Sequence, residues 1–167
     1  MTVNKKLAIF DLDHTILKCN SDHSWLDYLI NKGFIKREEY FEQNAEFQKK
    51  FREGDVNYKD YYEFTIQYLK DNSDDYISDI RSDFMKEIIE PSINIYALRL
   101  IHKHYEKDEE LLLASGTTSI IAGPIAKRLE FKNVVCTTCE KENNIYTGRI
   151  EDPPVSYTHL RAHETRF

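Results

Sequence analysis

Asp11 and Asp13 are the residues of this sequence whose type and spacing best suit chemistry. They follow directly on an apolar run at residues 7–10. Side chains two residues apart in extended backbone point to the same side, so the two carboxylates share one region of space. Carboxylates that close repel each other and need a cation or a proton between them. An oxygen-rich site with few protein ligands suits Mg²⁺, which often shares its site with a phosphate group.

Such a pair of acids could divide the hydrolysis of a phosphate ester between them. One carboxylate can attack phosphorus and give an aspartyl-phosphate, and a second carboxyl can pass a proton to the leaving alcohol. A second apolar run, residues 111–114, ends at Ser115, Gly116 and Thr117. The Ser115 hydroxyl could donate to a phosphoryl oxygen, and Gly116 allows the backbone to approach it closely. The positive end of the helix that follows would then face the anion.

Three short apolar runs predict the strands that position these residues. The runs at residues 7–10, 111–114 and 134–136 are typical of strands buried in a parallel sheet. Residues 145–150 are expected to form part of a hairpin. Ligands of parallel sheets bind beyond the carboxyl ends of the strands, which is where both polar clusters lie.

Helical spacing of apolar residues covers most of the remaining chain. From residue 24 to about residue 90, an aromatic-rich stretch predicts the core of a small helical bundle. Pro91 is expected to open another helix, and residues 120–129 a further one, with Pro124 near its first turn. The helix after Pro91 is expected to turn three apolar side chains inward, namely Ile95, Leu98 and Ile101. The order of elements predicts the α/β class, a Rossmann-like parallel sheet with a helical block inserted after its first strand.

Composition narrows the class of protein. The 167 residues suit one domain or a small two-part domain, and 23 basic against 29 acidic residues give a formal net charge of −6. We therefore expect no nucleic-acid partner and no membrane partner, because a global basic field and a long apolar run are lacking. Three cysteines are too few for a disulfide scaffold, which favours the cytoplasm. Cys136 and Cys139 have metal-like spacing without a second pair, so we interpret that spacing as coincidental.

Several of these segments together resemble the haloacid dehalogenase-like phosphohydrolases. Asp-Leu-Asp-His-Thr after the first apolar run is similar to the first motif of that family, and Ser115 is similar to its second. Residues 21–25 (Ser-Asp-His-Ser-Trp), 123–126 (Gly-Pro-Ile-Ala) and 146–149 (Tyr-Thr-Gly-Arg) look like subfamily IB. That subfamily includes phosphoserine phosphatase-like and histidinol-phosphatase-like members. The resemblance spans about residues 6 to 153.

The resemblance implies a role for each matching residue. Asp11 would be the nucleophile and a magnesium ligand. Asp13 would be the general acid and then the base that activates water, and its backbone carbonyl would also reach the Mg²⁺ ion. Thr15 would support the loop, while Ser115 with Gly116 would hold the phosphoryl group. The implied activity is Mg²⁺-dependent hydrolysis of a small phosphorylated metabolite through an aspartyl-phosphate.

The resemblance also implies a division of the chain. Residues 1–16 and 91–153 would form the α/β core, and residues 17–90 the helical cap. Residues 154–165 are similar to a translated transposase sequencing adapter, so residues 154–167 are interpreted as an artefactual tail after a C-terminal truncation. The family uses a phosphoryl-binding lysine and a second acidic motif further along the chain, and the sequence has neither after residue 153. The strand carrying that motif would pair beside the first strand, whose edge its loss leaves open.

Alternatives remain at the level of function and of single residues. The chain could be an inactive or phosphate-binding fragment without turnover. A nucleotide-sugar glycosyltransferase could also use an Asp-x-Asp pair, although the sequence lacks a Gly-rich nucleotide fingerprint. Asp22 and His23 could contact the substrate, or Ser21 or Asp22 could instead cap a helix. Arg52 could meet a substrate carboxylate, or it could lie on a solvated helix face.

Overall fold

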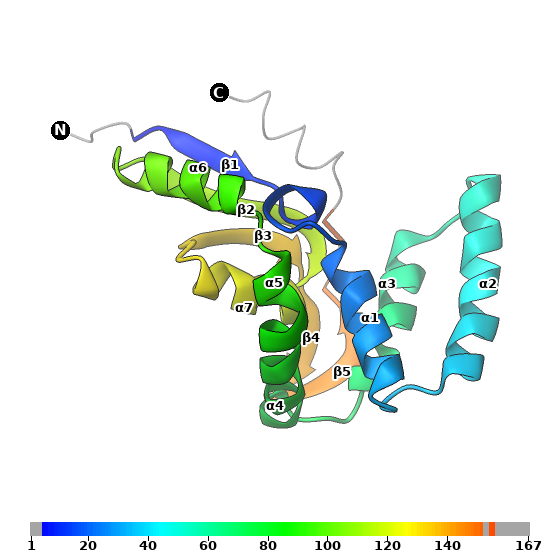
Figure 1. Cartoon of the computed structure of the whole chain (residues 1–167). Coiled ribbons are helices and arrows are strands. Elements are labelled where there is room, and N and C mark those ends of the chain that lie inside the picture. The colour runs from blue at the N-terminus through cyan, green and yellow to red at the C-terminus, as the bar shows by residue number, and fades with distance from the viewer. Residues whose placement is uncertain (1–4, 152–153, 156–167) are drawn as a thin grey trace.

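The computed structural model describes residues 5–151 and 154–155. The tail expected at residues 154–167 therefore lies outside the described residues, apart from Pro154 and Val155. The elements in chain order are β1 (Leu7–Phe10), η1 (Leu12–Ile16), α1 (Ser21–Asn31), α2 (Arg37–Glu53), α3 (Tyr58–Ile66), η2 (Gln67–Leu69), α4 (Asp74–Phe84), η3 (Met85–Ile89), α5 (Glu90–Ser92), α6 (Ile95–Tyr105), β2 (Glu110–Thr118), α7 (Ser119–Arg128), β3 (Asn133–Thr137), β4 (Cys139–Glu142) and β5 (Ile145–Ile150) (Figure 1).

A parallel sheet with the order β1-β2-β3 confirms the predicted α/β class. Phe10 pairs with Leu113, so β1 ends beside the middle of β2. All the helices from α1 to α6 lie in the chain between β1 and β2. Within the described residues no strand pairs with the outer edge of β1, and Leu7 and Ile9 are nearly half exposed there.

Strand β2 is longer than the apolar run predicts. It continues through Ser115 and Gly116 to Thr118, and its pairing with β3 shifts register between Ala114 and Thr118. Two consecutive β-branched threonines favour extended backbone, which explains the extension. Ser115 and Gly116 therefore lie within the last part of a strand, and the prediction that the strand ends before them is wrong.

Short polar side chains determine where several helices begin. Asn20, Asn57, Ser73 and Asn94 each accept a hydrogen bond from a backbone N–H in the first turn of the helix that follows. These bonds satisfy donors that have no partner within the helix. Helix α2 ends at Gly54, whose φ of 72° lies in the left-handed region that suits glycine.

The expectation that Pro91 opens a helix is wrong. Helices α4 and α5 join through η3 with helical backbone angles at Met85 and Glu90, and Pro91 lies at the end of this run. The N–H of Glu90 bonds to the carbonyl of Met85, five residues earlier, so the chain is already wider than an α-helix where the proline follows. Helix α6 begins only after Asn94. Its Ile101 is buried as expected, whereas Ile95 is 52% exposed.

Pro124 lies in the interior of α7 and not in its first turn. A proline there has no N–H to give to the carbonyl four residues earlier, which belongs to Ile120. Arg81 of α4 supplies the missing donor, since its Nη1 lies 3.2 Å from the Ile120 carbonyl oxygen. A charged side chain of α4 thus compensates for the proline in the interior of α7.

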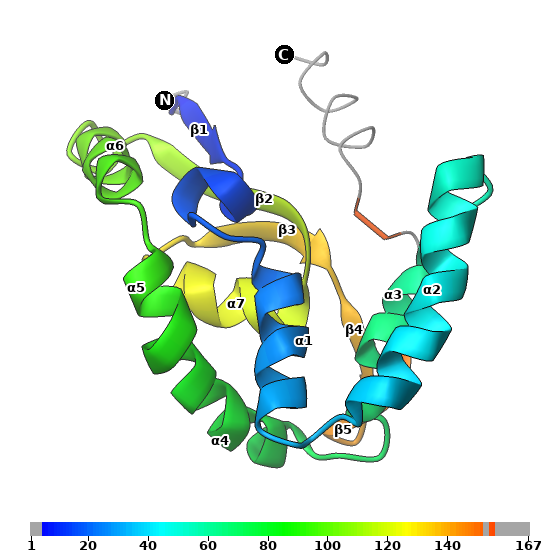
Figure 2. The ribbon, with the colours of Figure 1, turned by 45° about the vertical axis from the view of Figure 1, so that its right-hand side comes forward.

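The aromatic residues of the insert form two clusters and not the single bundle core that was expected. Trp25 of α1 packs against Phe84 of α4 with ring centroids 4.9 Å apart, and both belong to the main core. Phe47 of α2 and Phe64 of α3 stack separately at 4.9 Å. Figure 2 shows α2 and α3 side by side, away from α7, with the antiparallel hairpin of β4 and β5 beside α3.

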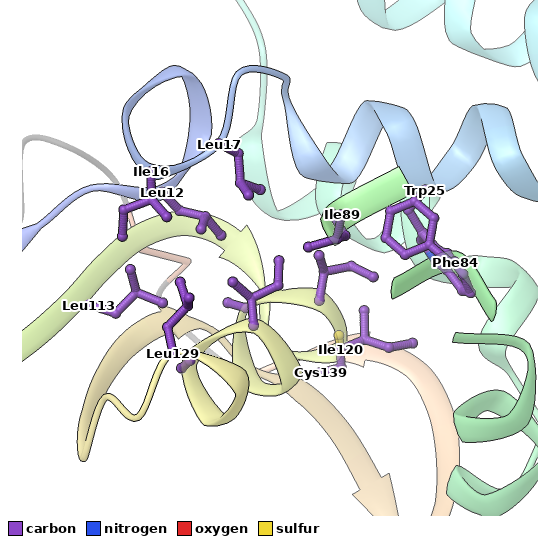
Figure 3. Close-up of a cluster of buried hydrophobic side chains, with 14 of the residues drawn as sticks. Leu12, Ile16, Leu17, Trp25, Phe84, Ile89, Leu113, Ile120, Leu129 and Cys139 are labelled. Atoms are coloured by element: carbon purple, nitrogen blue, oxygen red, sulfur yellow. The ribbon is translucent and has the colours of Figure 1, made fainter. Parts of the chain in front are cut away.

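The main core lies between β2, α7 and the turn η1 (Figure 3). Leu12 and Ile16 of η1 and Leu113 of β2 are fully buried. Each buried aliphatic side chain contributes about 1.5–3 kcal/mol to stability. None of the described helices is both long enough and apolar enough to span a bilayer.

Candidate active site

The apolar residues of the turn after β1 anchor it in the core. Leu12 and Ile16 are completely buried, while Asp11 and Asp13 between and before them are half-buried. Asp13 has extended backbone, and His14 has a φ of 57°, a conformation that non-glycine residues seldom adopt. Alternating buried and polar positions, together with this reversal, turn the two carboxylates away from the core.

The carboxylate of Asp13 is fixed by three hydrogen bonds. Its Oδ1 accepts from the backbone N–H of Ser21 at 2.9 Å and from the Ser21 hydroxyl at 2.6 Å. Its Oδ2 accepts from the Thr117 hydroxyl at 3.0 Å. Asp13 therefore joins the turn after β1, the start of α1 and the end of β2.

Asp11 is hydrogen bonded within its own turn. The Thr15 hydroxyl donates to Asp11 Oδ2 at 2.9 Å. Thr15 itself is exposed. This bond fixes the orientation of the Asp11 carboxylate, since a hydrogen bond from a neighbouring hydroxyl restricts rotation of the group that accepts it.

Ser115 is buried and connects to Asp13 through Thr117, and the neighbouring Gly116 is half-buried. The Ser115 hydroxyl donates to Thr117 Oγ1 at 3.0 Å and accepts from the Thr117 backbone N–H at 3.2 Å. A Cβ atom on Gly116 would lie 3.1 Å from the hydroxyl oxygen of Tyr62. A larger residue at position 116 would therefore require the Tyr62 hydroxyl to move by a few tenths of an ångström.

The side chain of Asp22, a residue of α1, lies at the N-terminal end of α7. Its Oδ1 accepts from the Thr118 hydroxyl at 2.8 Å, and its Oδ2 accepts from the Thr118 backbone N–H at 3.1 Å. Burial, reinforced by the negative charge of Asp13, raises the pKa of Asp22 to about 7. A protein carboxylate thus lies where the sequence predicted that the helix would face a bound anion.

A cavity of about 230 Å³ brings most of these groups together. Its walls come from η1, the start of α1, α3 and the end of β2. The lining residues are Asp13, His14, Asn20, Asp22, His23, Leu26, Tyr61, Tyr62, Thr65, Ser115, Gly116 and Thr117. Asp11 and Thr15, which the sequence also singled out, are not among them. A cavity this small suits a small molecule.

Charge in the cavity lining is acidic. Two of the described lining residues are aspartates, and none is a lysine or an arginine. Arg52 lies exposed on α2 and does not line the cavity. Burial and the charge of Asp22 raise the pKa of Tyr62 to about 12, so its phenol keeps its proton and can donate.

The donor set at this site fits magnesium. Asp11 and Asp13 offer hard oxygen donors, the type that Mg²⁺ prefers, and Mg²⁺ fills most of its sphere with water and phosphate oxygens. In the described part of the chain, no group of three or more His, Cys, Asp or Glu side chains could hold a metal ion alone. A site with few protein ligands, completed by substrate, is therefore the kind these residues can form.

Burial raises the pKa values of Cys136 and Cys139 to about 11, so both thiols keep their protons in the structure as it stands.

Three site residues were not assigned a site role from sequence. Thr117 links Ser115 to Asp13, Thr118 binds Asp22, and Tyr62 reaches Gly116 from α3. The two threonines directly follow the Ser-Gly pair, so their position was the available signal. Tyr62 lies in a tyrosine-rich stretch that offers no signal distinguishing it from a packing residue.

Comparison with known proteins identifies the family that the chain resembles. Haloacid dehalogenase-like hydrolases match residues 8–165 as a family. A protein of Neisseria meningitidis serogroup C (strain 8013) named histidinol-phosphatase is 31% identical over 151 residues, which are 90% of this chain and 68% of that protein.

Solved structures share the fold. A protein of unknown function from Bordetella pertussis Tohama I superimposes with a TM-score of 0.82 at 29% identity, over 91% of this chain and 69% of that one. A phospho-aspartyl intermediate analogue of phosphoserine phosphatase gives a TM-score of 0.56 at 19% identity, over 89% of this chain and 64% of that one. The similarity to phosphoserine phosphatase shows that the two chains share a fold.

Proposed function

The chain belongs to the haloacid dehalogenase-like hydrolases, and from that premise we propose that it hydrolyses a small phosphate monoester through an aspartyl-phosphate on Asp11. The observation that carries the proposal is the hydrogen-bonded group formed by Asp13, Ser21, Thr117 and Ser115 beside a small cavity. The Neisseria relative is named as a phosphatase, which supports a phosphorylated substrate.

In the first step, a carboxylate oxygen of Asp11 attacks phosphorus, and the bond between phosphorus and the alcohol oxygen breaks. Asp13, in its acid form, gives its proton to that leaving oxygen. The bonds from Ser21 and Thr117 orient the Asp13 carboxyl for this transfer. The products are the free alcohol and a phosphoryl group on Asp11.

In the second step, Asp13 takes a proton from a water molecule. The resulting hydroxide attacks phosphorus, and the bond between phosphorus and Asp11 breaks. Phosphate leaves, and the Asp11 carboxylate is restored. In this proposal Ser115 and the Gly116 N–H donate to the phosphoryl oxygens, which gain charge in both steps, and the Ser115 hydroxyl turns from Thr117 Oγ1 to do so.

Magnesium would be held by the Asp11 carboxylate and by the Asp13 backbone carbonyl. When bound, it supplies positive charge that offsets the repulsion between the nucleophile and the phosphate. We further propose that residues 1–16 and 91–153 form the catalytic core, and that residues 17–90 act as a cap that selects the substrate. Tyr62 and Asp22, which come from that segment, support the second assignment because they line the cavity.

The proposal is tested by measuring phosphate release from small phosphomonoesters by the full chain, with and without Mg²⁺. We expect Mg²⁺-dependent multiple turnover, and we expect Asp13→Asn to lower kcat at least a hundredfold because no group remains to protonate the alcohol. Glu151→Gln, an exposed change outside the cavity, serves as the control. Equal activity of Asp13→Asn and the unaltered chain would contradict the assignment.

A second candidate is phosphate binding without turnover. One observation favours it, namely that no lysine or arginine occurs among the described residues that line the cavity. Cationic side chains are a common means of stabilising a transferring phosphoryl group. Multiple turnover in the assay above rules this candidate out, whereas saturable phosphate binding with no release of product supports it.

A further inference from the structure

A groove between α4 and α7, here named the α4–α7 groove, carries positive charge at a distance from the active site. Its volume is about 620 Å³, and it shares no described lining residue with the active-site cavity. Three of its described lining residues are cationic, namely Arg81, Lys127 and Arg128, whereas one, Glu130, is acidic. In a chain with a formal net charge of −6, such a groove favours an anionic ligand.

Short side chains keep the α4–α7 groove open. Ser78 and Ser82 lie one turn apart on α4 and so share a face of that helix, and both line the groove. Gly123 and Lys127 have the same relationship on α7. A Cβ atom added to Gly123 would meet no atom within 4 Å, so space is open beside this residue. The two helices therefore leave room for a ligand between them.

The cationic side chains keep hydrogen-bond donors that the fold does not use. Arg81 Nη1 donates to the Ile120 carbonyl oxygen at 3.2 Å. Arg128 Nε and Nη2 donate to the two carboxylate oxygens of Glu90 at 2.5 and 3.1 Å. A guanidinium has five N–H groups, so both arginines retain donors, and their present bonds already hold them in place. Lys127 is exposed and takes part in no described ion pair.

A doubly charged oxyanion fits these groups. The arginine and lysine side chains and the two serine hydroxyls can all donate hydrogen bonds, and a phosphate group has several oxygens that accept them. The planar fork of arginine matches the spacing of phosphate oxygens. Glu130 is exposed and follows the end of α7, so water and salt screen its repulsion of an anion.

We propose that the α4–α7 groove is a second anion site, which binds a phosphate group that is either free or carried by a small ester. The inference goes beyond the proposed function and does not depend on it. Helix α7 joins the two places, because Ile120 accepts from Arg81 at the groove and Thr118, two residues earlier, binds Asp22 in the active-site cavity.

The test follows the backbone amide signals of the ¹⁵N-labelled full chain by NMR during titration with inorganic phosphate. The titration is run at about pH 8 without divalent cations, with ionic strength held constant by chloride. Gly123 lines the groove and Gly116 lines the active-site cavity, so their signals report the two sites separately. We expect a saturable shift of the Gly123 signal. Lys127→Gln should weaken this binding about fivefold, the effect of losing one exposed ion pair.

A parallel titration with glycerol 3-phosphate distinguishes the two sources of the phosphate group. Tighter binding of the ester would identify a phosphorylated molecule as the ligand, and equal or weaker binding would identify free phosphate.

Lys103→Gln is the matched control, because Lys103 is an exposed lysine in the last turn of α6, as Lys127 is in the last turn of α7. It should leave the affinity of the groove unchanged. Equal affinity of Lys103→Gln and Lys127→Gln for phosphate would overturn the inference, since Lys127 would then contribute nothing beyond net charge. A Gly123 signal that does not shift in the unaltered chain would also overturn it, with no variant needed. Neither result bears on the proposed function, which the Gly116 signal reports once Mg²⁺ is added.

Discussion

The Thr117 hydroxyl donates a hydrogen bond of 3.0 Å to the Asp13 carboxylate, across 104 positions of the sequence. This bond joins the end of β2 to the turn after β1, the two places where polar residues follow apolar strands. Thr117 Oγ1 also accepts a hydrogen bond from the Ser115 hydroxyl. Thr117 therefore connects Asp13, the proposed acid, to Ser115, the proposed phosphoryl-binding residue.

Replacing Thr117 with valine tests this link. Thr117→Val removes the donor to Asp13 and the acceptor of Ser115 while nearly preserving shape, so we expect unfolding free energy to fall by about 1–3 kcal/mol. We also expect kcat to fall about tenfold or more. Thr147→Val is the control, since it removes a hydroxyl bonded to Glu140 on the hairpin, outside the cavity. Unchanged kcat in Thr117→Val would show that Asp13 is positioned without it.

Arg81 and Pro124 are expected to be coupled energetically. Arg81→Ala removes the donor to the Ile120 carbonyl and should destabilise the chain by about 1–2 kcal/mol. In a Pro124→Ala background the helix regains its own N–H donor, so the same change should cost less. A double-mutant cycle by urea unfolding should give a coupling of about 1 kcal/mol. Strict additivity would show that the carbonyl does not depend on Arg81.

Stability should depend on the ionisation of Asp22. Its pKa is raised from 3.8 to about 7, so the folded state favours the protonated form. The resulting destabilisation is absent below about pH 4, grows as pH rises, and is complete above about pH 7. Asp22→Asn cannot ionise, so its Tm relative to the unaltered chain should rise between pH 4 and pH 8.

Thermal unfolding without added divalent cations measures this difference in Tm. Asp13, His14, His23, Tyr61 and Tyr62 also face the cavity, but they are present in both proteins and cancel in the comparison. Asp27→Asn should give a nearly constant difference over the same range. A difference in Tm between Asp22→Asn and the unaltered chain that falls with pH would mean that the Asp22 carboxylate is stabilised in the folded state.

Magnesium should stabilise the folded chain. Binding to the native state alone raises stability by an amount that grows with the ligand concentration relative to Kd. We expect millimolar Mg²⁺ to raise Tm, and Asp11→Asn to reduce this shift because it removes a carboxylate oxygen from the proposed site. An identical shift in both proteins would place the ion elsewhere. Na⁺ at matched ionic strength controls for screening.

The sequence was sufficient to predict the three parallel strands, but not where the second of them ends. Apolar runs followed by polar residues predict strands of a parallel sheet with polar groups at one edge, and Asp13 and Ser115 do line one cavity, although β2 continues past Ser115 to Thr118. Helix boundaries were less predictable. A proline is tolerated at the first turn of a helix and also after a wider turn, so Pro91 alone could not distinguish a start from an end.

Hydrogen bonds between distant segments could not be predicted from sequence. Asp22 and Thr118 are 96 positions apart, and a one-residue change in the register of β2 would direct different side chains toward α1. Capping of a helix by the residue that directly precedes it can be predicted from the local sequence, as for Asn20 and α1. Capping of α7 by a residue of α1 depends on packing that only the assembled fold provides.

The most direct test of the central claim is to trap the phosphoryl group on Asp11. The full chain is mixed with Mg²⁺ and a ³²P-labelled small phosphomonoester, quenched in acid and analysed by peptide mapping. We predict an acid-stable, hydroxylamine-sensitive label on the peptide that contains Asp11, and no label in Asp11→Asn. Label that persists in Asp11→Asn, or phosphate release by that variant at the unaltered rate, would contradict the account.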